Sequence, residues 1–482
     1  MPKRVAVIDL GSNSMRLAIF ERTSRFGFYI LAEHKLKIRL ANGAYENGGM
    51  LQMPAMKNAL EAFLEFKSLI KSYRANRVLC VGTSALRDAP NKNDFINMVK
   101  KAVNISIRVI DGTSEANFGA IAALNLLANF TDATTLDIGG GSSELACIKN
   151  KKIVDKISLN IGTVRLKELF FDKRDLSGLE DFVKELIDKI PADFKNENLI
   201  AIGGSGRALS NAIMNLQEYP LKIVHNFIYD YNVYRNFMSQ IIRSKAIDLN
   251  RFPIKKDRYD TIREGVFIFR QIADFLGAKK IITSGAGVRE GVFLSSILGR
   301  GTRLPENFNP SLKSLQDRFS VKNSNNIAKY AKNLFKILSP LHKLDEKYKY
   351  LLTNAAKICE IGLKVGFYAK HLHASYLALN ALNYGFKHDE KVLIAAIIAL
   401  HGKKELGMEF NDIKKLLPGE KIVIWLSFLL EFARILNENS DKIFALNYNN
   451  FNLKIVGAKE NLNLKESIKK LPKPAIFAIS LV

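Results

Sequence analysis

One short sequence pattern occurs twice in this chain, 128 residues apart. Residues 8–18 read IDLGSNSMRLA, and residues 136–146 read LDIGGGSSELA. Aspartate, glycine, serine, leucine and alanine recur in the same register. A single Asp-x-Gly-x-x-Ser pattern is typical of an ordinary β-turn, because glycine, asparagine and serine are common in hairpins. Its repetition one domain length apart predicts two copies of one structural unit.

Each copy predicts a strand, an acidic residue at its end, a turn and a returning strand. Glycine permits a positive φ and a close approach of the backbone to an anion. Successive N–H groups and serine hydroxyls can then bind phosphate oxygens. An aspartate beside such a turn suits Mg²⁺, which is held by one or two carboxylates together with substrate phosphates. The repeat therefore predicts two turns that grip a phosphate chain.

Two further motifs lie between the repeats. Residues 82–89 read GTSALRDA, and residues 110–116 read IDGTSEA. The repeat resembles the actin-like ATPase superfamily. All four motifs together resemble the exopolyphosphatase/guanosine pentaphosphate phosphohydrolase family, usually written Ppx/GppA, from residue 4 to about residue 300. This resemblance implies an α/β fold of duplicated actin-like (ribonuclease H-like) domains with a phosphate chain bound between them.

The resemblance implies a role for each matching residue. Glu115, just before a helix predicted over residues 116–127, matches the family's catalytic glutamate and is expected to orient a water and take its proton. In isolation, such a glutamate is also a routine partner of the helix dipole. Asp137 and Glu144 are the expected Mg²⁺ ligands, and Asp9 is expected to support a metal-bound water. The implied substrate-binding residues are Gly11, Ser12, Asn13, Ser14, Arg16, Thr83, Ser84, Arg87, Gly139, Gly140, Gly141 and Ser142.

Four parts are predicted along the chain. Residues 1–120 and 121–304 alternate strand and helix signals, as expected for two α/β domains. Residues 305–438 carry long amphipathic helical patterns and resemble the all-helical, HD-phosphohydrolase-like domain of longer family members. Residues 439–482 predict a small α/β lobe.

Local signals add two sets of expectations. The terminal lobe is predicted to have strands at residues 443–446, 453–456 and 475–479. Glycine-rich turns are expected to wall the cleft at residues 162–165, 203–207 and 284–291, the first with Arg165 as a weaker phosphate-binding candidate.

Three histidines of the helical part invite a metal assignment: His371, His373 and His401. An HD-type site would need a His-Asp pair in the preceding helix, where this chain has Cys359 and Glu360. We therefore expect no catalytic metal there, and predict that this domain serves homodimer formation and substrate channelling.

The formal net charge is +25, from 72 lysine and arginine against 47 aspartate and glutamate residues. Such an excess is typical of proteins with polyanionic partners, although a lysine-rich composition explains it equally well. The cleft motifs favour polyphosphate over any specific nucleic acid. Three widely spaced cysteines indicate a reducing, cytoplasmic location. The apolar stretch 422–436 contains Glu431 and Arg434, so it predicts a buried helix and no membrane partner.

The leading hypothesis is a Mg²⁺-dependent exopolyphosphatase that releases orthophosphate from the end of a polyphosphate chain. The nearest alternative is hydrolysis of guanosine pentaphosphate to guanosine tetraphosphate at the same site, a reaction of the stringent response. More distant alternatives are an actin-like kinase or nucleotide switch, and a silent polyphosphate-binding protein. Glu115 disfavours a kinase, which must exclude the water that this residue would activate. No P-loop or complete Rossmann motif occurs.

Overall fold

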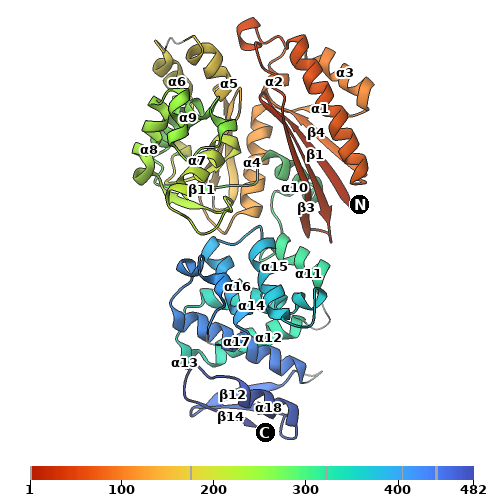
Figure 1. Ribbon diagram of the computed structural model, residues 1–482, viewed down its shortest axis with the longest axis vertical. Coiled ribbons are helices and arrows are strands. Elements are labelled where there is room, and N and C mark those ends of the chain that lie inside the picture. Colours follow the sequence, from red (N-terminus) through yellow and green to blue (C-terminus); the bar gives the residue numbers. More distant parts are fainter. Residues whose placement is uncertain (1–2, 174–175, 321–323, 404, 440–442) are drawn as a thin grey trace. The chain divides into compact units, whose positions relative to one another are not determined.

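The computed structural model describes residues 3–173, 176–320, 324–403, 405–439 and 443–482. The chain divides into two compact units, residues 1–308 and 309–482 (Figure 1). The finer division into four parts stays a prediction. Residues 440–442, next to the predicted boundary between residues 438 and 439, lie outside the described residues.

The first sheet has the strand order β3-β2-β1-β4-β5. Strands β1 (Arg4–Leu10), β2 (Ser14–Arg22) and β3 (Phe28–Lys37) are antiparallel neighbours. Parallel strands β4 (Arg77–Gly82) and β5 (Arg108–Val109) follow on the other side of β1. The first copy of the repeat forms the β1–β2 hairpin.

The second sheet repeats this arrangement in the order β8-β7-β6-β9-β11-β10. Its antiparallel strands are β6 (Ala133–Ile138), β7 (Ser143–Lys149) and β8 (Lys152–Leu159). Parallel β9 (Asn198–Ile202) and β11 (Lys280–Thr283) follow, with antiparallel β10 (Ile228–Asp230) at the edge. The second copy of the repeat forms the β6–β7 hairpin, so the predicted duplicated α/β fold is confirmed.

Both faces of each central strand are covered, which explains the continuous apolar runs. On the first sheet, Ile8 and Leu17 pack in one cluster with Phe63 of α1 (Met53–Ser72) and Phe95 of α3 (Lys92–Val103). On the opposite face, Phe20 stacks on Phe293 of α10 (Val288–Leu298) with ring centroids 4.3 Å apart.

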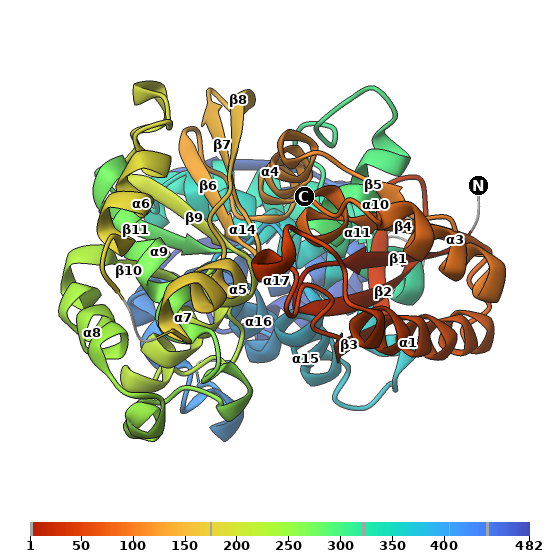
Figure 2. The same cartoon turned by 90° about the horizontal axis from the view of Figure 1, so that it is seen from above.

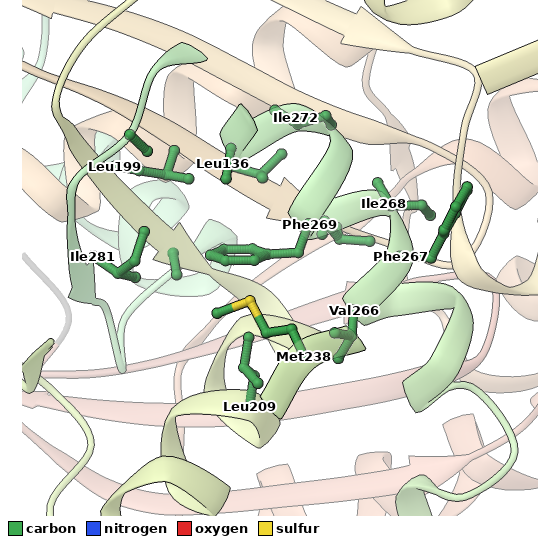
Figure 3. Packing of buried hydrophobic residues seen from close by; sticks show 14 of the residues in the cluster. Leu136, Leu199, Leu209, Met238, Val266, Phe267, Ile268, Phe269, Ile272 and Ile281 are labelled. Atoms are coloured by element: carbon green, nitrogen blue, oxygen red, sulfur yellow. The ribbon is translucent and has the colours of Figure 1, made fainter. Parts of the chain in front are cut away.

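The second sheet is also covered on two faces. Helix α4 (Gly112–Leu126) packs its alanines on β7 and lies between the two sheets (Figures 1 and 2). On the other face, Leu136 and Leu199 pack against Phe269 of α9 (Figure 3). The remaining α-helices of this unit are α2 (Ser84–Arg87), α5 (Thr163–Leu166), α6 (Leu179–Ile187), α7 (Gly203–Leu216), α8 (Tyr231–Arg243) and α9 (Ile262–Leu276).

The second unit is helical with a small α/β end, as predicted. A nearly all-apolar helix, α16 (His388–Leu400), forms its core, since every residue from Lys391 to Leu400 is buried. The other elements are α11 (Pro310–Phe319), α12 (Ser324–Ile337), α13 (Ser339–His342), α14 (Lys347–Ile358), α15 (Lys370–Ala381), α17 (Glu420–Glu438), α18 (Leu462–Lys470), β12 (Ala445–Asn449), β13 (Asn452–Val456) and β14 (Ala478–Leu481).

Two strands of the terminal sheet begin later than predicted. Strand β12 begins at Ala445 because the N–H of Phe444 donates a hydrogen bond to the Tyr330 hydroxyl, at 2.7 Å, instead of to the sheet. Strand β14 begins at Ala478 because the carbonyl of Phe477 accepts a hydrogen bond from Lys473 Nζ, at 2.6 Å. None of the described helices combines the length and the apolarity that crossing a bilayer requires.

Glu264, in the first turn of α9, is fully buried, and within the described part of the chain neither of its carboxylate oxygens has a hydrogen-bond partner. Burial raises the pKa of Glu264 to about 7, from an ordinary value of 4.5. The unfolded chain therefore releases this proton at a lower pH than the folded protein does. The contribution of Glu264 to stability accordingly falls as the pH rises from about 4.5 to about 7.

Replacing Glu264 by glutamine is expected to raise the free energy of unfolding by about 3 kcal/mol at pH 8, because the variant buries no charge. Near pH 4, where the native carboxyl is protonated, the gain should be close to zero. Urea unfolding at both pH values measures the difference, with Glu180→Gln on the exposed face of α6 as a control. The same gain in the free energy of unfolding at both pH values would contradict the raised pKa of Glu264.

Candidate active site

The two repeated turns lie against each other in the first unit. A Cβ added to Gly140 would lie only 2.8 Å from Ser12 Cβ. A cavity of about 120 Å³ opens beside the two turns. Thirteen of the sixteen predicted site residues line it, namely Asp9, Gly11, Ser12, Asn13, Ser14, Arg16, Thr83, Ser84, Glu115, Asp137, Gly139, Gly140 and Ser142. The structure thus brings segments from both halves of the unit to one place.

The two turns have the same backbone hydrogen bond. The N–H of Gly11 donates to the carbonyl of Ser14 at 3.2 Å, and the N–H of Gly139 donates to the carbonyl of Ser142 at 2.9 Å. This equivalence extends the sequence repeat to the geometry of the turns.

The turn glycines do not use the positive φ that glycine permits. None of the glycines at positions 11 and 139–141 has a positive φ. Close packing of protein groups explains the glycine at position 141. A Cβ there would lie 1.9 Å from the Tyr45 hydroxyl oxygen and 2.2 Å from Ser84 Oγ. Space, and not backbone conformation, requires glycine at this position.

Glu115 lies in the first turn of α4. The helix begins at Gly112, not at the predicted residue 116, because the Asp111 carboxylate caps it by accepting a 2.6 Å hydrogen bond from the N–H of Ser114. The Glu115 side chain is mostly buried and borders the cavity. Burial, followed by the charge of Glu144, raises the pKa of Glu115 well above its usual range, and Arg87 opposes this shift. A carboxyl with a raised pKa is suited to accept a proton from water.

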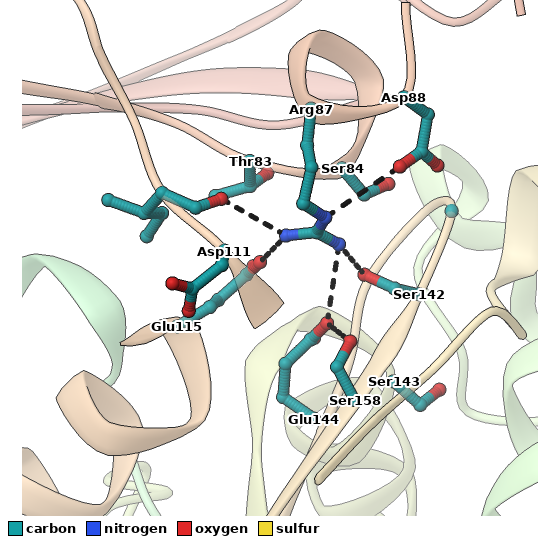
Figure 4. Close-up of polar contacts among 12 residues, drawn as sticks. Thr83, Ser84, Arg87, Asp88, Asp111, Glu115, Ser142, Ser143, Glu144 and Ser158 are labelled. Carbon is teal, nitrogen blue, oxygen red and sulfur yellow. Dashed lines mark hydrogen bonds and ion pairs between the residues drawn. The ribbon is translucent and has the colours of Figure 1, made fainter. Parts of the chain in front are cut away.

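Arg87 joins the two halves of the site (Figure 4). Its Nη1 donates to Glu115 Oε2 at 3.2 Å, and its Nη2 donates to Ser142 Oγ at 3.1 Å. The same Nη2 is 3.9 Å from Glu144 Oε1. Arg87 was predicted to bind phosphate, and the structure places its guanidinium among carboxylates.

Asp137 and Glu144 are direct cross-strand partners on β6 and β7, so their side chains share one face of the sheet. Glu144 Oε1 accepts a hydrogen bond from Ser158 Oγ at 2.9 Å. Within the described residues, Glu144 Oε2 is buried without a hydrogen-bond partner. Burial raises the pKa of Glu144 to about 7 and that of Asp137 above its usual range. Asp137 lines the cavity, whereas Glu144 does not and lies beside Asp137 on the neighbouring strand.

Asp9 occupies the equivalent position on β1, opposite Arg16 on β2. Burial raises the pKa of Asp9, and the nearby guanidinium of Arg16 offsets part of that shift. One hairpin therefore pairs two acids across its strands, and the other pairs an acid with a base.

A Mg²⁺ ion fits the residues present. In the part of the chain that the structure describes, no three His, Cys, Asp or Glu side chains form a cluster able to hold a metal by themselves. Mg²⁺ does not require such a cluster, because it keeps several waters and uses one or two carboxylates with substrate phosphates. Asp137 and the unpartnered Glu144 Oε2 offer that donor set, with Asp9 on the neighbouring hairpin.

Four arginines line the same cavity, and sequence reasoning identified only Arg16 among them as a binding residue. Arg207 and Arg289 belong to the glycine-rich turns that were predicted as cleft walls. Arg258 lies in a loop that carries no motif. Burial, followed by the charge of Arg16, lowers the pKa of Arg207 to about 10. Guanidiniums that repel one another in a cavity are suited to bind a polyanion.

The weaker phosphate candidate Arg165 is engaged elsewhere. Its Nη2 donates to Asp88 at 2.8 Å, and its Nε donates to the carbonyl of Gly141 at 2.9 Å. The guanidinium also lies over the Tyr45 ring, 4.3 Å from the centroid. Arg165 therefore ties the second turn to Asp88, the C-cap residue that ends α2.

The histidines of the second unit take part in an ion-pair network. The rings of His371 and His401 stack with centroids 4.7 Å apart. His401 Nδ1 lies 2.9 Å from Glu431, whose carboxylate also accepts two hydrogen bonds from Arg434. His373 does not line the small cavity beside these groups. His371, His401, Glu431 and Arg434 line that cavity together with Cys359 and Glu360.

Comparison with known proteins places both units of the chain in one family. Residues 18–299 match the model of the Ppx/GppA phosphatase family, and residues 309–473 match that of the Ppx/GppA phosphatase domain III. Fold and site define a phosphoanhydride hydrolase, and the predicted enzyme class is confirmed. The chain belongs to the Ppx/GppA phosphatase family.

Solved structures resemble the first part of the chain. The Ppx/GppA family member of Aquifex aeolicus is 27% identical with a TM-score of 0.52, and the alignment covers 62% of this chain and 98% of that one. An exopolyphosphatase from Cytophaga hutchinsonii is 24% identical with a TM-score of 0.56, covering 62% and 100% of the two chains. At 24% identity, the likeness to the Cytophaga hutchinsonii exopolyphosphatase shows a shared fold and nothing more.

Proposed function

We propose that this protein is an exopolyphosphatase that removes the terminal phosphate of inorganic polyphosphate by direct attack of water. The observation that carries the proposal is the meeting, in one cavity, of two equivalent phosphate-type turns with Glu115 and several arginines. Family membership supports the reaction class, and the cavity supports the choice of substrate.

In the proposed reaction, the N–H groups and hydroxyls of the turns hold the terminal phosphate. Glu115 orients a water in line with the anhydride bond and takes its proton as the bond breaks. Mg²⁺, when bound by Asp137 and Glu144, supplies charge neutralisation at the phosphate oxygens. The arginines at the cavity wall bind the remaining chain, whose charge they complement. Orthophosphate and a chain shorter by one unit are the products.

Guanosine pentaphosphate is the second candidate, because the cavity extends to Gly203, Gly204 and Ser205 in one of the glycine-rich turns predicted to wall the cleft. A nucleotide base usually requires a stacking surface or an apolar slot. Among the residues that the structure describes, no aromatic side chain lines this cavity, whereas four arginines do. The composition of the wall therefore favours a phosphate chain over a nucleoside.

The test is phosphate release by the full-length protein, measured side by side on long polyphosphate, guanosine pentaphosphate and ATP. We expect the highest kcat/KM on polyphosphate and the lowest on ATP. Higher kcat/KM on guanosine pentaphosphate would transfer the proposal to that substrate. Transfer of phosphate from ATP to an acceptor without phosphate release would favour an actin-like kinase.

The second unit is proposed to hold long chains and to form a homodimer. It carries 27 lysine and arginine residues against 15 aspartate and glutamate residues. The two solved structures named above cover 62% of this chain along 98% and 100% of their own length, and residues 1–308 form a compact unit, so that unit is expected to fold alone.

A chain ending at Phe308 is therefore expected to hydrolyse short polyphosphate and to lose preference for long chains. Its binding should also respond less to salt, because fewer phosphates are contacted, by analogy with nucleic acids. Rates on short and long polyphosphate across a salt series, with light scattering for the mass in solution, measure these effects. Equal chain-length preference and salt slopes in the two proteins would contradict the role of the second unit.

A further inference from the structure

The positively charged side chain of Arg87 lies between the carboxylates of Glu115 and Glu144. The two carboxylates come from α4 and from β7, and the Arg87 guanidinium reaches both, at 3.2 Å and 3.9 Å (Figure 4). Both glutamates are almost completely buried, and the Arg87 side chain is four-fifths buried. Two buried acids without a nearby cation would be costly, so this contact stabilises the substrate-free site.

Three of the five N–H donors of the guanidinium are in hydrogen bonds. Besides the bond to Glu115, Nη1 donates to the carbonyl of Ile110 at 3.3 Å and Nη2 donates to Ser142 Oγ at 3.1 Å, while Nε is 3.7 Å from Asp88 Oδ1. Arg87 does not line the cavity beside the two turns. Its guanidinium must therefore move away from the carboxylates to bind a phosphate oxygen in that cavity.

The same contacts oppose a divalent cation. A full positive charge within about 4 Å of the carboxylates repels a metal at close range, and this repulsion is large in a buried site. Arg87 also donates a hydrogen bond to one of the two carboxylate oxygens of Glu115. The charge of Arg87 between the two acids therefore weakens the binding of Mg²⁺ beside them.

We propose that Arg87 is a built-in counter-cation that occupies the Glu115–Glu144 pair in the resting enzyme and moves to phosphate as Mg²⁺ and substrate enter. The inference rests on the proposed function. It assigns Arg87 a positioning role, because Glu115 is freed to act on water only when a phosphate has drawn the guanidinium away. Without substrate the enzyme should bind Mg²⁺ weakly.

The experiment is calorimetric titration of Mg²⁺ into full-length protein without substrate. Arg87→Gln is expected to bind Mg²⁺ about tenfold more tightly than the native protein, because one positive charge is removed within about 4 Å of the carboxylates. Arg87→Met, of similar length and also uncharged, should show the same gain. Arg87→Lys, which keeps the charge, should remain close to the native affinity. Arg165→Gln is the matched control, since that guanidinium pairs with Asp88 and not with Glu115 or Glu144.

Unchanged or weaker Mg²⁺ binding in both neutral variants would overturn the proposal, and so would undetectable binding in the native protein and in both variants. Thermal unfolding of each variant establishes that it is folded. Because two neutral variants are made, the test still works if one of them does not fold. The titration contains no phosphate compound. If the native enzyme releases no phosphate from polyphosphate, guanosine pentaphosphate or ATP, the proposed function is contradicted. The Mg²⁺ titration decides the role of Arg87 separately.

Discussion

Replacing Glu115 by glutamine is expected to lower phosphate release from polyphosphate by at least about 100-fold, the usual scale for losing a general base. The amide keeps the size and the hydrogen bond to Arg87 but cannot take the proton of water. The buried position beside the cavity and the raised pKa of Glu115 both point to this role. Initial rates at saturating Mg²⁺ measure the loss, and equilibrium binding of polyphosphate should stay near the native value.

The matched control is Glu168→Gln in the same unit. Glu168 is also a buried glutamate with a raised pKa caused by burial, but its carboxylate accepts a hydrogen bond from the N–H of Gly43 and does not line the cavity. We expect a rate within a few-fold of the native one for this variant. Near-native turnover of Glu115→Gln would move the general base to another residue.

Glu144→Gln and Asp137→Asn are expected to lower activity at a fixed, low Mg²⁺ concentration by about 10- to 100-fold, the scale seen when support for a bound metal is weakened. Each substitution removes one of the few protein ligands that Mg²⁺ would keep at this site. Rates measured across a Mg²⁺ series should show a midpoint shifted to higher concentration, with partial recovery for the weaker ligand.

The Glu168→Gln variant again serves as the control, and its Mg²⁺ midpoint should be native. If both Asp137→Asn and Glu144→Gln keep the native Mg²⁺ midpoint, the metal is bound elsewhere. A uniform loss of rate without a shifted midpoint would assign these carboxylates to substrate positioning.

The repeat predicted the two hairpins and the two copies of one structural unit, because an aspartate at a strand end and a serine after glycine recur in the same register. The register that places Asp137 opposite Glu144 follows from the short turn between the two strands. The packing of Tyr45 and Ser84 against Gly141 could not be predicted, because it depends on the whole fold.

Long-range contacts account for most of what sequence reasoning missed. Arg258 lines the cavity from a loop without a motif, so its position follows only from how the loop packs. Arg165 matched a phosphate-binding turn, but its partner Asp88 is 77 residues away in the chain. The contacts of Arg87 with Glu115 and Glu144 likewise join separate elements, and no local pattern predicts which oxygen a flexible guanidinium will reach.

The source of the oxygen in the released phosphate tests the central claim most directly. Long polyphosphate is hydrolysed by the native protein in ¹⁸O-labelled water, and the orthophosphate and the shortened chain are analysed by mass spectrometry. Direct attack of water on the terminal phosphorus predicts one labelled oxygen from water in each released phosphate and none in the new chain end. Label in the chain end, or phosphate lost from polyphosphate without label in the product, would contradict this account.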